Sequence, residues 1–323
     1  MHLQSKIYIA GHKGLVGSSL VRKLELEGYQ NLLVRTHRDL DLTNQELVYS
    51  FFQREKPDYV FLAAAKVGGI LANKNYPAEF IYQNLNIQSN VIDASWRSGV
   101  KRLLFLGSSC IYPKECPQPI KEEYLLSAPL EPTNQAYAIA KIAGIEMCRS
   151  YNQQYGTQYL CTMPTNLYGP GDNYDLETSH VLPALIRKMH MAKMENQPSV
   201  EIWGSGKPRR EFLYSDDLSD ACVHLMKLPD QEFNSLVFNG PAPLINIGTG
   251  EDLTIAELAN AVAKVIEFEG ELVYDISKPD GTMRKRLDVS KIYRLGWKPQ
   301  TNLVQGIKLS YDDWLNRKLE CLS

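Results

Sequence analysis

Short apolar runs alternate with longer segments of helical periodicity along the first 165 residues of the chain. From this pattern we predict strands at Ile7–Ala10, Leu32–Arg35, Tyr59–Leu62, Arg102–Gly107 and Tyr159–Pro164, and helices at about 14–27, 43–55, 77–98 and 134–155. Strict alternation of strands and helices is typical of an α/β fold with a parallel sheet, helices on its faces and right-handed crossovers.

The periodicity weakens after Pro164, where a turn-rich stretch begins. The elements expected beyond it are a helix from about Ser179, strands at Val200–Trp203 and Leu244–Ile247, a helix with a capping box of Thr254 and Glu257, and mixed turns and helical periods from Lys278 to Leu319. This change of pattern predicts a second, smaller lobe.

Composition narrows the classes of partner. The 323 residues include 35 basic and 37 acidic side chains, so the charge balance favours neither a nucleic acid nor an anionic membrane surface as partner. The six cysteines form no C-x-x-C pair and have no histidine at zinc-finger spacing, so we expect reduced thiols and no metal site. No apolar run approaches the roughly 18 residues of a membrane-spanning helix. A cytoplasmic protein is therefore expected.

A glycine-rich turn follows the first predicted strand. Gly11, Gly14 and Gly17 have G-x-x-G-x-x-G spacing between that strand and the next helix. Glycine allows a sharp turn and a close approach of the backbone to a pyrophosphate, whose charge is met by the amides at the helix N-terminus. The strand before the triplet and the helix after it favour dinucleotide binding over a simple turn.

The residues after the second predicted strand indicate which dinucleotide binds. A carboxylate there suits the ribose 2′-hydroxyl of NAD, whereas cations suit the 2′-phosphate of NADP. The chain has Arg35, His37 and Arg38 at this point, and Lys13 lies in the glycine turn. NADP(H) is therefore the predicted cofactor. In the alternative interpretation, Arg35 and Arg38 are solvated surface charges.

Tyr137 and Lys141 are one turn apart on a predicted helix, so their side chains share a face. A phenol has an ordinary pKa of about 10, and we expect the neighbouring ammonium to lower the pKa of Tyr137. Tyr137 could then exchange a proton with a substrate oxygen while hydride moves to or from carbon. Ser108, at the end of the fourth predicted strand, is placed to hydrogen-bond the same oxygen. The pair predicts oxidation or reduction at a carbonyl.

The order of these motifs resembles the extended, nucleotide-sugar branch of the short-chain dehydrogenase/reductase superfamily. The matching segments are the glycine triplet, 63–65, Ser108, Tyr137 with Lys141, Pro164–Pro170 and Asn246–Gly250. The resemblance implies a Rossmann-type doubly wound parallel sheet over residues 1–170 and a smaller C-terminal α/β substrate lobe over 171–323, with about 215–250 returning to the first domain. It also implies a homodimer that pairs the helices around 77–98 and 134–155 in a four-helix bundle.

The segment 108–113, with Ala65–Gly69 and His180, resembles the members of this branch that act on GDP-4-keto-6-deoxy-D-mannose. For these the resemblance implies that Cys110 and His180 are the acid and base that invert C3 and C5, before NADPH reduces the C4 ketone. Ser108 and Tyr137 would hold the oxygen that carries the enolate charge. Which of Cys110 and His180 is the acid stays open. In the alternative interpretation, Cys110 is a packed thiol and His180 a residue of a helix cap.

The resemblance also implies the binding residues. For the cofactor they are Gly11, His12, Lys13, Gly14, Leu15, Val16, Gly17, Arg35, His37, Arg38, Asp41, Leu42, Ala63, Ala64, Leu106, Gly107, Ser108, Tyr137, Lys141, Pro164, Asn166, Leu167 and His180. For the diphosphate and sugar of a GDP-sugar substrate they are Val181, Lys188, Trp203, Arg210, Asp280 and Lys285. Relatives tend to have arginines where this chain has Lys13 and His37, so its selectivity for NADPH is expected to be weaker.

Two alternative functions stay open on the sequence. The first is another epimerase or a dehydratase of the same superfamily with tightly held NAD. A dehydratase is expected to have an acidic pair beside Ser108, where this chain has Cys110 and Ile111. The second is a non-catalytic NADP-binding regulator, which would be expected to lose Ser108, Tyr137 or Lys141, and the chain keeps them all.

Overall fold

A six-stranded, wholly parallel sheet forms the larger part of the computed structural model, which describes residues 1–176, 178–278 and 280–320. Its strands are β1 (Ile7–Ala10), β2 (Leu32–Leu33), β3 (Tyr59–Leu62), β4 (Arg102–Leu106), β5 (Tyr159–Pro164) and β10 (Leu244–Ile247), in the order β10-β5-β4-β3-β1-β2. The predicted strands are confirmed, although β2 ends two residues earlier than predicted and β4 one residue earlier.

The chain reverses its direction across the sheet at β1. It runs from β1 to β2 on one side and then returns to β3 on the other side of β1. In doubly wound sheets, ligands bind beyond the carboxyl ends of the strands at such a switch point. The glycine turn 11–17 follows β1 directly. The fold therefore brings this turn to the position where a dinucleotide is expected.

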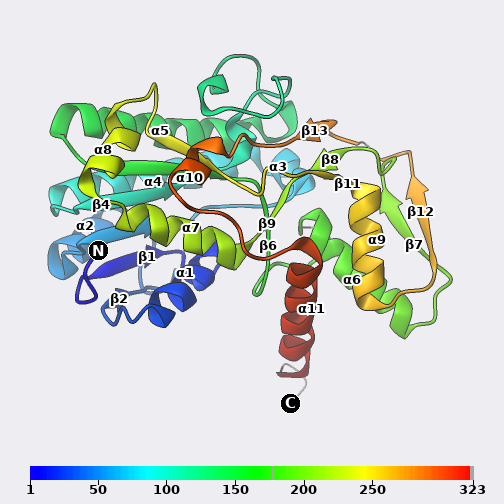
Figure 1. Cartoon of the computed structure of the whole chain (residues 1–323). Helices are drawn as coiled ribbons and strands as arrows, with labels where there is room; N and C mark the ends of the chain where they lie inside the picture. The colour runs from blue at the N-terminus through cyan, green and yellow to red at the C-terminus, as the bar shows by residue number, and fades with distance from the viewer. Residues whose placement is uncertain (177, 279, 321–323) are drawn as a thin grey trace.

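Helices cover both faces of the sheet (Figure 1). Those of this part of the chain are α1 (Leu15–Leu26), α2 (Gln45–Glu55), α3 (Ile70–Asn75), α4 (Pro77–Arg97), α5 (Gln135–Tyr155), α7 (Ser215–Lys227), α8 (Asp230–Phe238) and α10 (Ser290–Arg294). Short 3₁₀ helices lie at η1 (Ser109–Ile111), η2 (Glu122–Tyr124) and η3 (Pro132–Asn134). On one face α4 packs against α2 and α5, and on the other α1 packs against α7.

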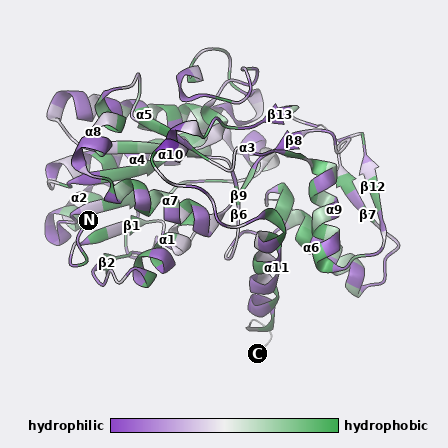
Figure 2. Cartoon of the chain, in the orientation of Figure 1, coloured by the Kyte–Doolittle hydropathy of each residue, from purple (hydrophilic) through white to green (hydrophobic). Residues whose placement is uncertain are grey.

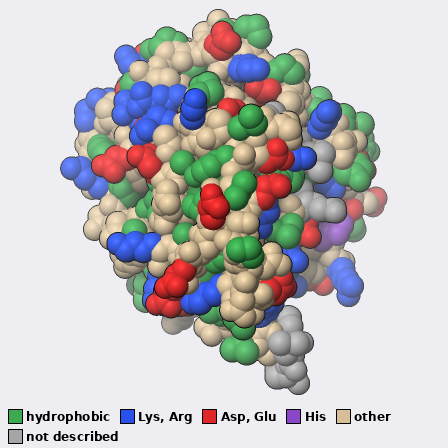
Figure 3. Space-filling model, turned by 90° about the vertical axis from the view of Figure 1, so that its right-hand side faces the viewer, with side chains coloured by type: hydrophobic (Ala, Val, Ile, Leu, Met, Phe, Trp, Pro, Cys, Tyr) green, Lys and Arg blue, Asp and Glu red, His purple; other side chains and the backbone are tan. Residues whose placement is uncertain are grey.

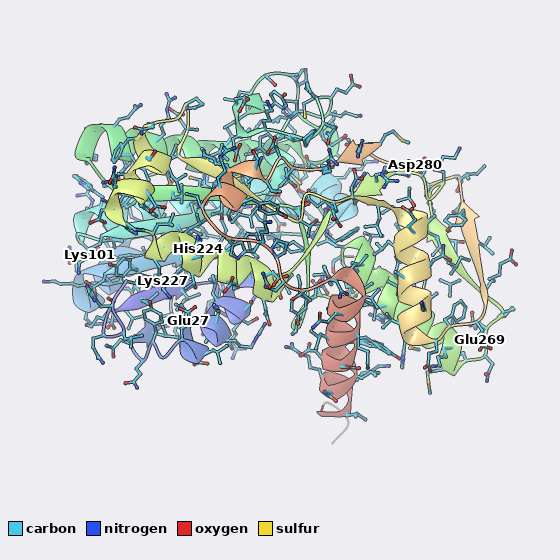
Figure 4. The ribbon with its side chains drawn as sticks, in the orientation of Figure 1. Glu27, Lys101, His224, Lys227, Glu269 and Asp280 are labelled. Atoms are coloured by element: carbon cyan, nitrogen blue, oxygen red, sulfur yellow. The ribbon has the colours of Figure 1, made fainter. Side chains whose placement is uncertain are left out.

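An ion pair marks the contact of α1 with α7. The Lys227 ammonium on α7 lies 3.0 Å from the carboxylate of Glu27 at the end of α1 (Figure 4). Both side chains are partly exposed, so this pair contributes at most about 1 kcal/mol. Apolar burial therefore holds the helices on the sheet. Figure 2 shows the corresponding pattern, with hydrophobic strands inside and hydrophilic residues along the outer helices.

A second hydrophobic cluster lies beyond the main sheet, to the right in Figure 1. Its elements are α6 (Val181–Met194), α9 (Ile255–Ile266), α11 (Leu303–Glu320), and the strand pairs β7 (Ser199–Trp203) with β12 (Glu271–Asp275) and β6 (Asn166–Tyr168) with β9 (Phe212–Tyr214). The short strands β11 (Leu253–Thr254), β8 (Arg209–Arg210) and β13 (Arg284–Lys285) form a further sheet. The capping box predicted at the start of α9 is confirmed.

The chain passes more than once between the two clusters. After α6 to β9 it returns to the main core with α7, α8 and β10, and β10 pairs with β5 at the edge of the large sheet. Residues 287–297, including α10, return to the same core after β13. No helix in the described part of the chain is long and apolar enough to cross a membrane. On the face drawn in Figure 3, acidic and basic side chains are interspersed with apolar ones.

Candidate active site

Close packing explains two of the three glycines of the turn. Gly11 has φ +86°, and a Cβ there would lie 2.7 Å from the Ala64 amide nitrogen. A Cβ on Gly17 would lie 2.0 Å from the Gly11 carbonyl oxygen. At Gly14, in contrast, the nearest atom would be 3.5 Å away, which is an ordinary contact. Gly14 is therefore open to the outside of the turn, while Gly11 and Gly17 pack the strand against the helix.

The N-terminus of α1 is suited to a phosphate group. Gly14 is its N-cap, no side chain caps it, and no acidic residue lies in its first turn. The first amides of a helix lack internal partners and carry the positive end of its dipole. Ala63, which directly follows β3, donates its N–H to Ala10 at 3.1 Å and so brings the segment 63–64 to the same edge. These residues fit the pyrophosphate of a nicotinamide dinucleotide.

The remaining predicted cofactor residues of the sheet also lie at this edge. Leu106 ends β4, and Gly107 follows it with an N–H donated to Thr162 at 2.9 Å. Pro164 ends β5, and Asn166 and Leu167 begin β6. A Cβ on Gly107 would lie 2.1 Å from the Met163 methyl group, so this position too is closely packed.

Some of the cations that we expected around a 2′-phosphate already interact with carboxylates of the protein. Arg35 is in an ion pair with Glu55 of α2 at 3.1 Å, and its guanidinium lies over the Phe51 ring. Part of the Arg35 charge is therefore neutralised within the protein by Glu55. The exposed His37 ring lies 3.8 Å from Asp41, which itself accepts a hydrogen bond from the Thr43 amide.

Lys13 and Arg38 are the better candidates for a phosphate contact. Both side chains are exposed, and within the described residues neither forms an ion pair. The His12 ring hydrogen-bonds the backbone at Arg35 and so ties the glycine turn to the end of β2. Leu42 is buried in the main core, where its carbonyl accepts a hydrogen bond from Asn90 at 2.9 Å.

Tyr137 and Lys141 project from the first turns of α5 toward the end of β4. Lys141 is buried and donates its ammonium to the Leu106 carbonyl at 2.7 Å, with the Phe105 ring 4.7 Å away. The Tyr137 hydroxyl hydrogen-bonds with Ser108, the first residue after Gly107. The structure therefore brings together the serine, tyrosine and lysine that the sequence placed far apart.

The Tyr137 phenol does not have the lowered pKa that we expected from the sequence. Burial raises the pKa of Tyr137, the Cys110 sulfur raises it further, and the Ser108 hydrogen bond lowers it by less. Burial also lowers the pKa of Lys141 to about 7, because its ammonium loses contact with water. The expectation that Lys141 lowers the pKa of Tyr137 is therefore wrong. Tyr137 keeps its proton at neutral pH, which suits a proton donor.

Cys110 lies in η1, directly beside this group. The Ser108 hydroxyl accepts a hydrogen bond from the Cys110 amide at 3.2 Å and so caps the short helix. The Cys110 side chain is half-buried and faces Tyr137 on one side. On the other side it faces two cations, Arg210 of β8 and Lys285 of β13. The thiol is therefore in a polar, charged setting and not in an apolar core.

His180 is the N-cap of α6, and the residue keeps contact with solvent although protein packs densely around its ring. Desolvation by the surrounding protein lowers the pKa of His180, so the ring loses its proton more readily than an ordinary histidine. Gly69 donates its N–H to the carbonyl of Thr178 at 3.2 Å, which ties the turn before His180 to the loop after β3. The turn before His180 therefore contacts the loop that contains Lys66–Gly69.

Trp203 and Lys188 lie together at the second lobe. Trp203 ends β7 with 55% of its surface exposed, and the Lys188 ammonium of α6 lies 5.2 Å from its ring centroid. Burial lowers the pKa of Lys188, and its ammonium donates to the Glu201 carbonyl at 3.2 Å. Val181, at the start of α6, is also exposed. An exposed aromatic ring beside a cation fits a base or sugar joined to a diphosphate.

The structure distinguishes Arg210 from its neighbour Arg209. Arg209 donates to the Asp252 carboxylate at 2.9 Å and to its carbonyl at 2.8 Å, so it is occupied within the protein. Arg210 is half-buried with its charge toward Cys110 and Asp280, and burial lowers its pKa. Arg210 is thus the better placed of the two for a substrate phosphate.

Asp280 has a structural role that the sequence did not predict. Its carboxylate accepts hydrogen bonds from the Ser205 amide at 2.7 Å and the Ser205 hydroxyl at 2.8 Å. These bonds lower the pKa of Asp280 and hold the turn after β7, near β8 in Figure 4. A Cβ on Gly204 would lie 2.5 Å from this carboxylate.

Two further residues organise the site and were missed in the sequence. Tyr112 donates its hydroxyl to Asn246 at 2.6 Å in the buried interior and so joins the motif 108–113 to the motif 246–250. Glu211 is fully buried, and its carboxylate accepts from the amides of Gly250 and Leu287, both at 2.8 Å. The available signal for Glu211 was an acidic residue directly before the apolar run Phe212–Tyr214.

The parallel sheet, the glycine turn at its switch point and the Ser108, Tyr137 and Lys141 group define a nicotinamide-dependent enzyme of nucleotide-sugar type. The chain belongs to the NAD dependent epimerase/dehydratase family, whose model matches residues 7–239.

The similar proteins include enzymes of GDP-sugar metabolism. GDP-L-fucose synthase 1 of Arabidopsis thaliana is 55% identical over 311 residues, which are 96% of this chain and 93% of that protein. GDP-L-fucose synthase of Escherichia coli K12 is 50% identical over 318 residues, or 98% of each chain. Among solved structures, the GDP-mannoheptose C4 reductase MlghC of Campylobacter jejuni with NADP bound is 45% identical, with a TM-score of 0.88 over 98% of this chain and 99% of that one.

Proposed function

We propose that the chain converts GDP-4-keto-6-deoxy-D-mannose to GDP-L-fucose, by epimerisation at C3 and C5 and NADPH-dependent reduction of the C4 ketone. The observation that carries this proposal is the Cys110 thiol beside the Tyr137 and Ser108 hydroxyls. Reduction needs a proton donor only at the carbonyl oxygen. A thiol in this position adds an acid–base group at the neighbouring carbons. The identity of 50 to 55% with relatives named GDP-L-fucose synthase supports the same activity.

In the first stage, Ser108 and Tyr137 hold the C4 carbonyl oxygen. Negative charge develops on this oxygen when a proton leaves C3 or C5, and the two hydroxyls stabilise it by hydrogen bonds. Cys110 and His180 exchange protons with the carbon, one on each side, so that the configuration inverts. The second carbon inverts in the same site by the same exchange.

In the second stage, the glycine turn 11–17 would hold NADPH, which would supply the hydride for C4. Tyr137 gives its proton to the C4 oxygen, consistent with a raised pKa that keeps the phenol protonated at neutral pH. Lys141 orients the edge of β4 through its bond to Leu106. Arg210 and Lys188 bind the diphosphate, and Trp203 packs against the substrate.

We also propose NADPH as the preferred cofactor. Lys13 and Arg38 are the exposed cations near the end of β2 and contact the 2′-phosphate, while Arg35 is held by Glu55. Because Arg35 is already paired with Glu55, the preference over NADH is modest. Fluorescence titration is expected to give tighter binding of NADPH, and equal affinities would contradict the proposal.

A homodimer through α4 and α5 completes the proposal. These helices pack against each other, and both carry large exposed apolar side chains, Tyr82 on α4 and Ile139 on α5. A four-helix bundle with a second copy would cover them. Light scattering is expected to give twice the mass of the chain, and a monomer would contradict it. We place the enzyme in the cytoplasm, where its thiols stay reduced.

A single assay tests the activity. The enzyme is incubated with GDP-4-keto-6-deoxy-D-mannose and NADPH in deuterated water, and the product is examined by NMR. We expect GDP-L-fucose with deuterium at C3 and C5. Cys110→Ser is expected to oxidise NADPH without proper epimerisation, and normal GDP-L-fucose at a normal rate from this variant would exclude the role of Cys110. Oxidation of NADPH by the wild type without deuterium at either carbon would instead indicate a C4 reductase without epimerisation.

A further inference from the structure

The strand β7 presents a carboxylate and an indole side by side on the second lobe, at the right in Figure 1. Side chains alternate between the two faces of a strand, and Glu201 and Trp203 share the exposed face of β7. The Trp203 indole donates its Nε1–H to Oε1 of Glu201 at 3.1 Å. Within the described residues, the Glu201 carboxylate forms no further hydrogen bond and no ion pair. Its second oxygen, Oε2, is therefore open to a ligand.

Two lysine ammoniums lie over the Trp203 ring. That of Lys188 is 5.2 Å from the ring centroid, and that of Lys278 is 5.4 Å from it. Lys188 comes from α6 and is held by the Glu201 carbonyl at 3.2 Å. Lys278 is exposed in the loop after β12, where its amide donates to the Asp275 carbonyl at 3.2 Å. The indole thus has a carboxylate at its edge and positive charge over its ring.

The loop with Lys278 connects the indole to the proposed diphosphate site. Gly281 in this loop lies against Arg210, since a Cβ on Gly281 would be 3.5 Å from the Arg210 guanidinium. The chain from Lys278 to Gly281 spans at most about 10 Å. A nucleotide whose diphosphate lies at Arg210 can therefore reach the indole of Trp203 with its base.

We propose that Glu201 determines specificity for guanine, by accepting hydrogen bonds from N1–H and N2–H of a base that stacks on Trp203. This inference rests on the function proposed above. Stacking uses the face of the indole, whereas Glu201 binds its edge, so both contacts form together. The exposed Glu201 side chain reaches the stacked base by rotation about its own torsions.

The donor and acceptor pattern of guanine matches this set of side chains. Its N1–H and N2–H are neighbouring donors, and the two oxygens of a carboxylate can accept from both. Its O6 and N7 are acceptors to which a lysine can donate, and Lys278 is placed beside the ring for this contact. Adenine would instead direct the acceptor N1 at the carboxylate of Glu201 and an amino group at the ammonium of Lys278. Glu201 therefore favours guanine over adenine.

Binding of nucleoside diphosphates tests the proposal without catalysis. The affinities of GDP, IDP and ADP for the full-length enzyme are measured by isothermal titration calorimetry. IDP keeps N1–H but lacks the 2-amino group, so it loses one of the two bonds to Glu201. Because hydrogen bonds to charged groups are among the stronger ones, the wild type is expected to bind GDP about tenfold more tightly than IDP. ADP is expected to bind more weakly than IDP.

Glu201→Gln keeps an acceptor for the indole N–H but has one acceptor oxygen in place of two. Its affinity for GDP is expected to fall by about tenfold, and its preference for GDP over IDP to about twofold or less. Loss of a negative charge alone would strengthen the binding of a diphosphate. A weaker affinity for GDP therefore reports the lost hydrogen bond to the base and not a change of net charge.

Glu271→Gln is the matched control. Glu271 is exposed on β12, four residues before Asp275, the register partner of Trp203, and so about 13 Å along the strand. This variant is expected to keep the wild-type affinities, and circular dichroism checks that both variants are folded. An unchanged preference for GDP over IDP in folded Glu201→Gln would overturn the proposal. Equal affinities of the wild type for GDP and IDP would also overturn it, even if Glu201→Gln did not fold.

The assay in deuterated water separates this proposal from the proposed function. If the wild type forms no GDP-L-fucose, the proposed function fails, while a preference for GDP that depends on Glu201 still supports the base contact. If the wild type forms GDP-L-fucose but binds GDP and IDP equally, the proposed function holds and the role of Glu201 is overturned.

Discussion

The Tyr137 phenol is the residue on which the reduction depends most directly. Because burial raises its pKa, it is protonated at neutral pH and can donate to the C4 oxygen. Tyr137→Phe removes that proton, and general acids typically contribute about 10² to 10⁴ in rate. We expect NADPH oxidation to fall by at least about 100-fold, and NADPH binding to change little. Stopped-flow absorbance and a binding titration measure the two, and a loss below tenfold would mean that another group supplies the proton.

How far the sequence determines a side chain's role depends on where its partner is. Tyr137 and Lys141 are four residues apart on one helix, so their shared face follows from helical geometry. The ion pair of Arg35 with Glu55 of α2 was not predicted, because the two residues are far apart in the sequence. The hydrogen bonds that Ser205 donates to the Asp280 carboxylate were likewise not predicted. Local spacing therefore predicts contacts within one element, and contacts between distant elements need the fold.

At the scale of elements, Gly17 and Gly14 in the turn between β1 and α1 differ in how closely they are packed. A Cβ on Gly17 would lie 2.0 Å from the Gly11 carbonyl, whereas a Cβ on Gly14 would meet nothing closer than 3.5 Å. Gly17→Ala must therefore push β1 and α1 apart, and overpacking of this kind costs about 1 to 3 kcal/mol. Thermal unfolding without cofactor is expected to show a lower Tm for Gly17→Ala.

Gly14→Ala is the matched control for that experiment. It adds the same methyl group three residues away, at a position with φ −78° that alanine adopts without strain. Its Tm is expected to stay close to that of the wild type. Equal losses of Tm in the two variants would mean that the turn needs flexible backbone in general and that the contact with the Gly11 carbonyl is not the cause.

The strands β1, β3 and β4 were predictable because each contains four continuous apolar residues, and β5 and β10 are apolar apart from Thr162 and Asn246. The sheet of β11, β8 and β13 was not, because each of these strands has two residues and shows no periodicity. These short strands carry Arg210 and Lys285 to Cys110. The part of the site least visible in the sequence is therefore the part that surrounds the thiol.

At the scale of the whole molecule, Glu211 ties together segments that follow different strands. It lies between β8 and β9, and its carboxylate accepts from Gly250 after β10 and from Leu287 after β13. Leu287 belongs to the main core, while Phe212 belongs to the second one. The two hydrophobic clusters thus meet at a buried carboxylate, and its ionisation should couple to the stability of the fold.

Burial raises the pKa of Glu211 from its ordinary 4.5 to about 7, although backbone amides from Leu287, Gly250 and Thr249 favour the anion. The folded state therefore binds more protons than the unfolded state between these two pH values. Its free energy of unfolding should fall as pH rises through this window, by up to about 1.4 kcal/mol per pH unit. Glu211→Gln cannot ionise and loses one acceptor, so we expect it to be less stable than the wild type at pH 5.5.

The difference in free energy of unfolding between wild type and Glu211→Gln should accordingly shrink from pH 5.5 to pH 7.5, measured by urea unfolding. Glu257→Gln is the control. Hydrogen bonds with Thr254 in the capping box lower the pKa of Glu257, so this group is ionised in both states across the window. The difference between wild type and Glu257→Gln should not change with pH. If the Glu211→Gln difference is equally constant, Glu211 is already ionised at pH 5.5, and its backbone hydrogen bonds outweigh its burial.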